Sequence, residues 1–381
     1  MGNGRDIEMR VGFLIRVNIK SNIGLILAMF LATPLFAQRN TYSVMELVTP
    51  AGNSGAARGL NRLGQVAGRV ATGLATQTRG WYWKTSRDVQ RLDPLGAGEY
   101  SAAFGLNDAG EIVGTSNTAN SMEPFIWSPA MGIRLIPKLP GYNSGQAFAI
   151  NNRGEVVGYS SGAQGVRAFR WMRTGAVQNL GTLSGGNSSK ALDLNETGGV
   201  VGVSDSSGGA RAFLWKQTEG MRDLGVLPGD QSSQAVAINN IGNVVGYSLG
   251  SRGMRAFLWT AATGAMQNLG VLPGGDNSRA LDISNSGVVV GTSAIAEGDR
   301  AFIWSEKTGM LDLNDLIPAG LDFVLVEAHA INDRGQILAL GIDPPDHETQ
   351  PGGEGGHHDN RESPGRLLLL TPAGVASVPS P

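Results

Sequence analysis

Four histidines are the side chains of this chain best suited to moving a proton near neutral pH. His329 follows Glu327 by two residues, and a nearby carboxylate can orient a histidine that acts as a general base. In other copies of the repeat described below, the corresponding residue is apolar, namely Leu192, Val236 or Leu281. His329 is therefore the catalytic candidate, and the alternative is a buried histidine with a structural role.

The other three histidines, His347, His357 and His358, fall within residues 343–365. Acidic residues accompany them, and imidazole and carboxylate groups together are ligands for zinc, nickel or copper. This segment is rich in Pro, Gly and charge, a composition that predicts a flexible insertion without fixed ligand geometry. No Ser-His-Asp arrangement and no spaced metal motif stands out. We therefore expect no cofactor and no enzyme.

Seven copies of one pattern must position these residues. Tryptophan recurs about every 44 residues, at Trp83, Trp127, Trp171, Trp215, Trp259 and Trp304. Within each copy, four short runs rich in Val, Leu, Phe and Trp are separated by Gly and Asn, a pattern that predicts four strands. Seven such copies predict an all-β fold, a seven-bladed β-propeller built from four-stranded repeats. The alternative is a β-solenoid.

The first turn of each copy reads Asn-x-x-Gly, from Asn61–Gly64 to Asn332–Gly335, with Ser284 in place of Asn in the sixth copy. Glycine closes a tight turn at positive φ, and the Asn side chain can bond the backbone of the turn. A calcium loop would need several carboxylates per turn, which most copies lack. The pattern therefore indicates a structural turn.

The third strand reads Arg-Ala-Phe-Leu/Ile-Trp, as in Arg211–Trp215. Phe and Trp two residues apart point to the same face of a strand, so the pair predicts packing between blades. The alternative is a ring of exposed aromatics that stack on sugars. We expect the Arg to bond neighbouring strands or loops. Residues 42–48 align with the fourth strand, so we expect this N-terminal strand to join the last blade and close the ring, with residues 374–378 as the alternative.

Asn-x-x-Gly-x-Val-Val-Gly, followed by Ala-Phe-Leu-Trp and a Leu-Gly-x-Leu-x-Gly-Gly return, resembles the extracellular HAF-repeat family, named for a His-Ala-Phe triplet. The resemblance covers roughly residues 56–370. It implies export and a repeat body in a bacterium, and it supplies no catalytic residues. In most copies of this chain the triplet reads Arg-Ala-Phe, and in the second it reads Glu123-Pro124-Phe125.

The N-terminal residues indicate where the protein is located. Basic residues precede an apolar stretch that ends in Leu35-Phe36-Ala37, which predicts a signal peptide over residues 1–37 and one propeller domain over residues 38–381. An uncleaved anchor is the alternative; after removal of the signal no membrane-spanning segment would remain. We expect a secreted, periplasmic or cell-surface protein.

The chain has no cysteine, so disulfides are excluded. Without residues 1–37 it would carry 26 basic and 30 acidic residues, a mildly negative balance that gives no indication of a nucleic-acid partner. We expect a monomer.

Connections from the fourth strand of one copy to the first strand of the next diverge into different polar residues. Variable polar loops on a rigid scaffold predict a binding face for an extracellular ligand, glycan or protein. The candidate residues are Asn143, Gln146, Asn187, Lys190, Gln231, Gln234, Asn277 and Arg279. The sequence thus predicts a non-enzymatic binding module. The alternative is a propeller hydrolase or lyase acting on extracellular polysaccharide.

Overall fold

The computed structural model describes residues 41–49, 55–71, 77–96, 98–343 and 365–374. The chain divides into residues 1–37 and residues 38–381, and every described residue belongs to the second unit. The expected signal peptide and the histidines of the insertion, His347, His357 and His358, lie outside the described residues.

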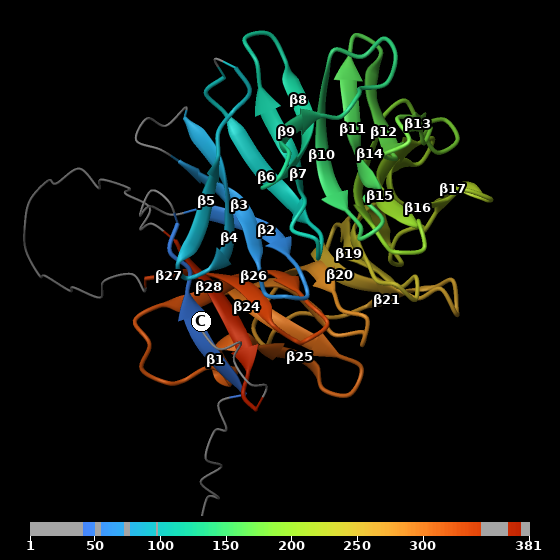
Figure 1. The fold of residues 1–381 in the computed structure, drawn as a ribbon. Helices are drawn as coiled ribbons and strands as arrows, with labels where there is room; N and C mark the ends of the chain where they lie inside the picture. Colours follow the sequence, from blue (N-terminus) through green and yellow to red (C-terminus); the bar gives the residue numbers. More distant parts are fainter. Residues whose placement is uncertain (1–40, 50–54, 72–76, 97, 344–364, 375–381) are drawn as a thin grey trace, which may run out of the picture. The chain divides into compact units, whose positions relative to one another are not determined.

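Seven antiparallel four-stranded sheets form a ring, which is the predicted seven-bladed β-propeller. Figure 1 shows the sheets following one another in sequence order.
Blade 1 contains β2 (Gly55–Leu60), β3 (Val66–Ala71), β4 (Thr78–Thr85) and β5 (Asp88–Leu92).
Blade 2 contains β6 (Ser101–Leu106), β7 (Ile112–Asn117), β8 (Met122–Ser128) and β9 (Gly132–Leu135).
Blade 3 contains β10 (Ser144–Ile150), β11 (Val156–Gly162), β12 (Gly165–Trp171) and β13 (Val177–Asn179).
Blade 4 contains β14 (Ser189–Leu194), β15 (Val200–Ser206), β16 (Gly209–Lys216) and β17 (Gly220–Asp223).

The remaining blades continue the same order.
Blade 5 contains β18 (Asp230–Ile238), β19 (Val244–Gly250), β20 (Gly253–Trp259) and β21 (Met266–Asn268).
Blade 6 contains β22 (Asn277–Ile283), β23 (Val289–Ile295), β24 (Gly298–Ser305) and β25 (Gly309–Asp312), and a short 3-10 helix, η1 (Leu313–Leu316), follows it.
Blade 7 contains β26 (Val324–Ile331), β27 (Ile337–Ile342), β28 (Arg366–Pro372) and β1 (Tyr42–Glu46).

Blade 7 closes the ring with both ends of the propeller. β1 pairs antiparallel with β28, with Val44 opposite Leu370, and forms the outermost strand of that blade. In Figure 1 these two strands, blue and red, lie side by side. The prediction that the N-terminal strand closes the ring is therefore confirmed. Residues 343–365 connect β27 to β28, as expected, and residues 344–364 lie outside the described residues.

The hydrophobic core lies between adjacent blades. Each buried cluster of the described residues joins two neighbouring sheets; for example, Val201 and Leu214 of blade 4 pack with Phe257 and Trp259 of blade 5. The Phe of the repeated Phe-x-Trp pair is fully buried in blades 2 to 6, and Trp259 is 2% exposed. Burying a large apolar side chain contributes about 1.5–3 kcal/mol. The prediction that the aromatic pair packs between blades is confirmed.

The repeated Arg also acts between blades. Nη1 of Arg211 donates to the carbonyl oxygen of Gln231 in the next blade at 2.6 Å, and Arg167 bonds Asn187 in the same way. The expectation that this Arg bonds neighbouring loops is therefore confirmed.

Candidate functional site

The innermost strands of the seven blades surround a channel of about 880 Å³. Each of these strands runs from the 4→1 connection toward the Asn-x-x-Gly turn, so equivalent residues form rings around the channel. Some rings repeat nearly the same residue type in every blade, whereas in others the residue type changes from blade to blade.

A β-bulge interrupts every innermost strand at the same point, after a buried alanine such as Ala191. The extra residue of a bulge leaves the regular alternation, which lets a sheet redirect a side chain. All seven extra residues line the channel: Arg58, Phe104, Phe148, Leu192, Val236, Leu281 and His329.

The bulge explains the glycine of the Val-Val-Gly run. A Cβ on Gly202 would stand 2.0 Å from the carbonyl oxygen of Lys190, and one on Gly158 would stand 1.9 Å from that of Gln146. These distances are far below van der Waals contact, so in blades 3 and 4 the second strand accommodates the bulge only with glycine. Blade 7 has Ala339 at the equivalent position, and its innermost strand has the bulge as well.

One sector of the channel is polar and charged. Nδ1 of His329 lies 3.5 Å from Oε1 of Glu327, and the His329 side chain is 11% exposed. Burial lowers the pKa of His329; Glu327 opposes this shift, and the positive charges of Arg58 and Arg279 add to it. The imidazole is therefore neutral at pH 7. If its proton is on Nδ1, toward Glu327, then Nε2 keeps a lone pair that can accept a proton.

The sector next to it, in blades 2 and 3, is aromatic. The rings of Phe104 and Phe148 lie 5.3 Å apart, and those of Phe148 and Tyr159 lie 5.7 Å apart. Nζ of Lys190 lies 5.2 Å from the centre of the Tyr159 ring. A hollow of about 360 Å³ adjoins the channel here and is lined in part by Phe148, Lys190 and Gln234. The rings of Phe104 and Phe148 line the channel and form a wall on which a flat apolar group can pack.

Two carboxylates occupy a ring whose other members are glycine or alanine. Asp193 and Asp282 line the channel and are partly exposed to it. Oδ2 of Asp193 accepts the backbone N–H of Ile238 at 2.8 Å, and Oδ2 of Asp282 accepts that of Ile331 at 2.8 Å. Burial in the ring of strands raises the pKa of Asp193 to about 7 and that of Asp282 to about 6. Both therefore change charge near neutral pH.

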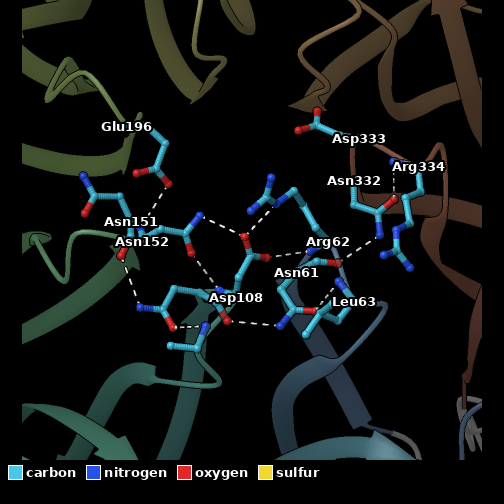
Figure 2. A network of polar contacts seen from close by, with 12 residues as sticks. Asn61, Arg62, Leu63, Asp108, Asn151, Asn152, Glu196, Asn332, Asp333 and Arg334 are labelled. Atoms are coloured by element: carbon cyan, nitrogen blue, oxygen red, sulfur yellow. Dashed lines mark hydrogen bonds and ion pairs between the residues drawn. The ribbon is translucent and has the colours of Figure 1, made fainter.

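The Asn-x-x-Gly turns form a ring of side-chain bonds between blades. Nδ2 of Asn61 donates to the carbonyl oxygen of Asn107 at 3.1 Å, and Nδ2 of Asn332 donates to that of Asn61 at 2.9 Å (Figure 2). Equivalent bonds of 3.0–3.2 Å link the intervening blades as far as Ser284, whose hydroxyl does not replace the missing amide donor. The turns thus have the predicted structural role and also join the blades.

A second ring is formed by the residues that follow these asparagines. The backbone N–H of Arg62 donates to Oδ1 of Asp108 at 3.0 Å, and that of Asn152 donates to Oε1 of Glu196 at 2.9 Å (Figure 2). Nε of Arg62 also contacts Oδ2 of Asp108 at 2.7 Å. Internal bonds therefore occupy the polar side chains at this end of the channel.

The structure divides the predicted ligand-face residues into two sets. Gln146, Lys190, Gln234 and Arg279 are equivalent residues of the innermost strands; Gln234 and Arg279 line the channel, and Lys190 lines the adjoining hollow.

Asn143, Asn187, Gln231 and Asn277 line neither the channel nor the hollow, and backbone or side-chain atoms of each bond neighbouring residues. For example, Oδ1 of Asn277 accepts the N–H of Met254 at 2.7 Å, and the N–H of Asn143 bonds the carbonyl oxygen of Ser161 at 3.2 Å.

Sequence reasoning missed Arg58, Asp193 and Asp282. Aligning the copies would have shown an arginine among mostly apolar residues, and two aspartates among glycines and alanines. In the part of the chain that the structure describes, no three His, Cys, Asp or Glu side chains gather as a metal site. No helix within the same ranges is long and apolar enough to cross a membrane.

The seven-bladed fold and its channel define the class of protein, a β-propeller. The chain belongs to the family described as protein of unknown function (DUF3466), whose pattern matches residues 140–354, more than half of the chain. No curated protein matches it.

Several solved propellers are similar in fold. A catalytically inactive virginiamycin B lyase from Staphylococcus aureus, in complex with quinupristin, is 12% identical with a TM-score of 0.52, covering 87% of this chain and 99% of that one. The propeller domain of the Trilobed protease from Pyrococcus furiosus is 14% identical with a TM-score of 0.51, covering 70% and 84%. YCF48 bound to D1 peptide is 12% identical with a TM-score of 0.50, covering 89% and 98%. At these identities the likeness shows the fold alone.

Proposed function

We propose that this protein is an exported, non-enzymatic binding module, monomeric, whose ligand enters the central channel from the side of the 4→1 connections. The ligand is the end of a glycan or a segment of a partner protein. A channel of about 880 Å³ falls within the usual range of ligand sites and is too small for a folded domain.

The observation that carries this proposal is the contrast between the rings. Positions that hold the blades together repeat the same residue types, as in the Asn ring. The bulge ring instead varies from Arg58 through Phe104 and Leu192 to His329. A scaffold does not need this variety, whereas selective binding of an asymmetric ligand does. We therefore place the proposed ligand-binding site in the channel and not on the 4→1 connections.

Export is supported by residues 1–37 and by the resemblance to the HAF-repeat family. Both indicate a bacterial protein of the periplasm, the cell surface or the medium. The absence of cysteine is compatible with any of these compartments.

The test is binding of residues 38–381 to a glycan array and a peptide array, with reducing-end release measured for every glycan hit. We expect binding without release. Arg279→Gln, in the channel, should abolish the binding, and Gln231→Ser, at the start of β18 next to the 4→1 connection and outside the channel, should leave it unchanged. If Gln231→Ser abolishes the binding and Arg279→Gln leaves it unchanged, the ligand binds on the loops. If the protein binds nothing on either array, the proposal is contradicted.

A lyase or hydrolase is the second candidate, because one observation favours it. A neutral His329 beside Glu327, with Arg58 and Arg279 nearby, provides a base and positive charge in one sector of the channel. Such a group can remove a proton while the cations stabilise the developing anion. Turnover of any array hit that is lost in His329→Ala would establish this candidate in place of the binding module.

A further inference from the structure

Two arginines in the channel have no partner among the residues that the structure describes. Arg58 comes from β2 and Arg279 from β22, and neither makes a hydrogen bond or an ion pair with any residue that the structure describes. Both line the channel together with His329, and their positive charges help to lower the pKa of that imidazole. They are also exposed to the lumen to different degrees, Arg58 more than Arg279.

The carboxylates of the channel are already engaged. Glu327 contacts His329, and Asp193 and Asp282 accept backbone N–H groups of the next blade. The lumen therefore offers two unpaired guanidinium groups in blades 1 and 6, on either side of blade 7. Guanidinium groups form short, charge-assisted hydrogen bonds to carboxylate or phosphate.

An apolar surface begins beside this cationic sector. Around the bulge ring, Arg58 of blade 1 is followed by Phe104 of blade 2 and Phe148 of blade 3, and the ring of Tyr159 supports that of Phe148. Phe104 and Phe148 are only half-buried, so a ligand can cover ring surface that water now contacts.

We propose that the channel ligand is a small amphiphilic anion, with its negative group held by Arg58 and Arg279 and a flat aromatic or apolar body packed on Phe104 and Phe148. This inference rests on the proposed channel-binding function and specifies the chemistry of the ligand. In a glycan or a peptide, the matching features are an acidic group next to a flat apolar face.

The probes are 2-naphthoate, 2-naphthyl phosphate and the neutral 2-naphthamide, titrated calorimetrically into residues 38–381. We expect at least one anion to bind, with a dissociation constant at least 10-fold lower than that of the amide. Arg58→Gln and Arg279→Gln should each weaken the anion by about 10-fold or more. Phe148→Leu should weaken every naphthyl probe by roughly 3- to 10-fold.

Arg134→Gln is the matched control. Arg134 lies on β9, the outermost strand of blade 2, and does not line the channel. The Arg134→Gln variant should bind the anion with the same dissociation constant as the unchanged protein. Thermal unfolding of each variant separates lost binding from lost folding.

Three results would each overturn the inference. The amide and the anions could bind equally well, Arg58→Gln and Arg279→Gln could both leave anion binding unchanged, or no anion could bind at 5 mM. The proposed function fails in a different way. If a neutral array ligand binds and Phe148→Leu abolishes that binding, the channel remains the site but the inference of an anionic ligand is contradicted. If array ligands bind equally well to every channel variant, both the channel site and the anionic ligand are contradicted.

Discussion

Replacing Asn195 by serine should break the polar ring between blades 4 and 5. Nδ2 of Asn195 donates to the carbonyl oxygen of Asn239 at 3.0 Å, and its Oδ1 accepts the N–H of Gly199 at 2.8 Å and that of Thr197 at 3.1 Å. The residue is 5% exposed. Serine at the equivalent Ser284 keeps a bond within the turn, to the N–H of Val288 at 3.2 Å, and loses the bond to the next blade.

The cost follows from these contacts. Asn195→Ser removes one hydrogen bond between blades, while the Asn239 carbonyl oxygen still accepts the N–H of Gly242 at 3.0 Å. A lost bond costs about 1 kcal/mol, so we expect the free energy of unfolding to fall by about 1 kcal/mol. Ser284→Asn makes the reverse change in blade 6. It should complete the ring and raise the free energy of unfolding by about 1 kcal/mol.

Urea unfolding of residues 38–381, followed by tryptophan fluorescence and by circular dichroism, measures both changes. Coincident transitions justify a two-state treatment, and an unchanged m-value assigns the shift in midpoint to stability. Asn268→Ser is the control, because Asn268 is exposed and its Oδ1 bonds only the nearby N–H of Gly270 at 2.8 Å. If Asn195→Ser stays within about 0.5 kcal/mol of the unchanged protein, or Ser284→Asn destabilises it, the ring does not link the blades energetically.

Three further predictions concern the channel and ring closure. The raised pKa values of Asp193 and Asp282, about 7 and about 6, mean that their contribution to stability is complete below about pH 4 and is lost as the pH rises through 6 to 7. Asp193→Asn should therefore raise the free energy of unfolding by about 2 kcal/mol at pH 8, after allowance for screening by channel water, with little gain at pH 4; a gain independent of pH in melting curves would contradict this. Gly202→Ala should cost about 3 kcal/mol in urea unfolding, because the new Cβ meets the Lys190 carbonyl oxygen at 2.0 Å, and a neutral result would mean that the bulge relaxes freely. Deleting residues 38–48 should lower the melting temperature and promote association, because β28 becomes an unpaired edge; light scattering that detects only a monomer of unchanged stability would oppose that.

Much of the fold was predictable because its signals are local and recur. The spacing of Trp215 and Trp259 sets the blade length, the turn at Asn195 marks the end of each first strand, and Arg211 lies where it reaches the next blade. Each of these residues acts within its own repeat or on the adjoining one. The same local signals therefore occur in each of the seven copies, which makes the fold easy to predict.

The candidate site was predictable only in part. The contrast between His329 and its apolar equivalents was visible in the sequence, and Lys190, Gln234 and Arg279 were identified as variable polar residues. Asn187 and Gln231 looked equally suitable as ligand-binding residues, and they line neither the channel nor the hollow. Spacing alone does not distinguish a polar residue that faces the channel from one that lies outside it.

The sequence by itself determined the repeat, its strands and turns, and the packing role of residues such as Phe213, because each depends on hydrophobic pattern and turn chemistry over a few residues. Only the tertiary structure decided which side chains share the channel. Arg58 and His329 lie 271 residues apart, and β1 must pair with β28 before blades 7 and 1 become neighbours. The bulge then redirects one residue per blade toward the axis, and bonds within the ring engage most of the remaining polar groups. The combination of unpaired cations and an aromatic wall is thus a property of the closed ring, to which each repeat contributes only one or two side chains.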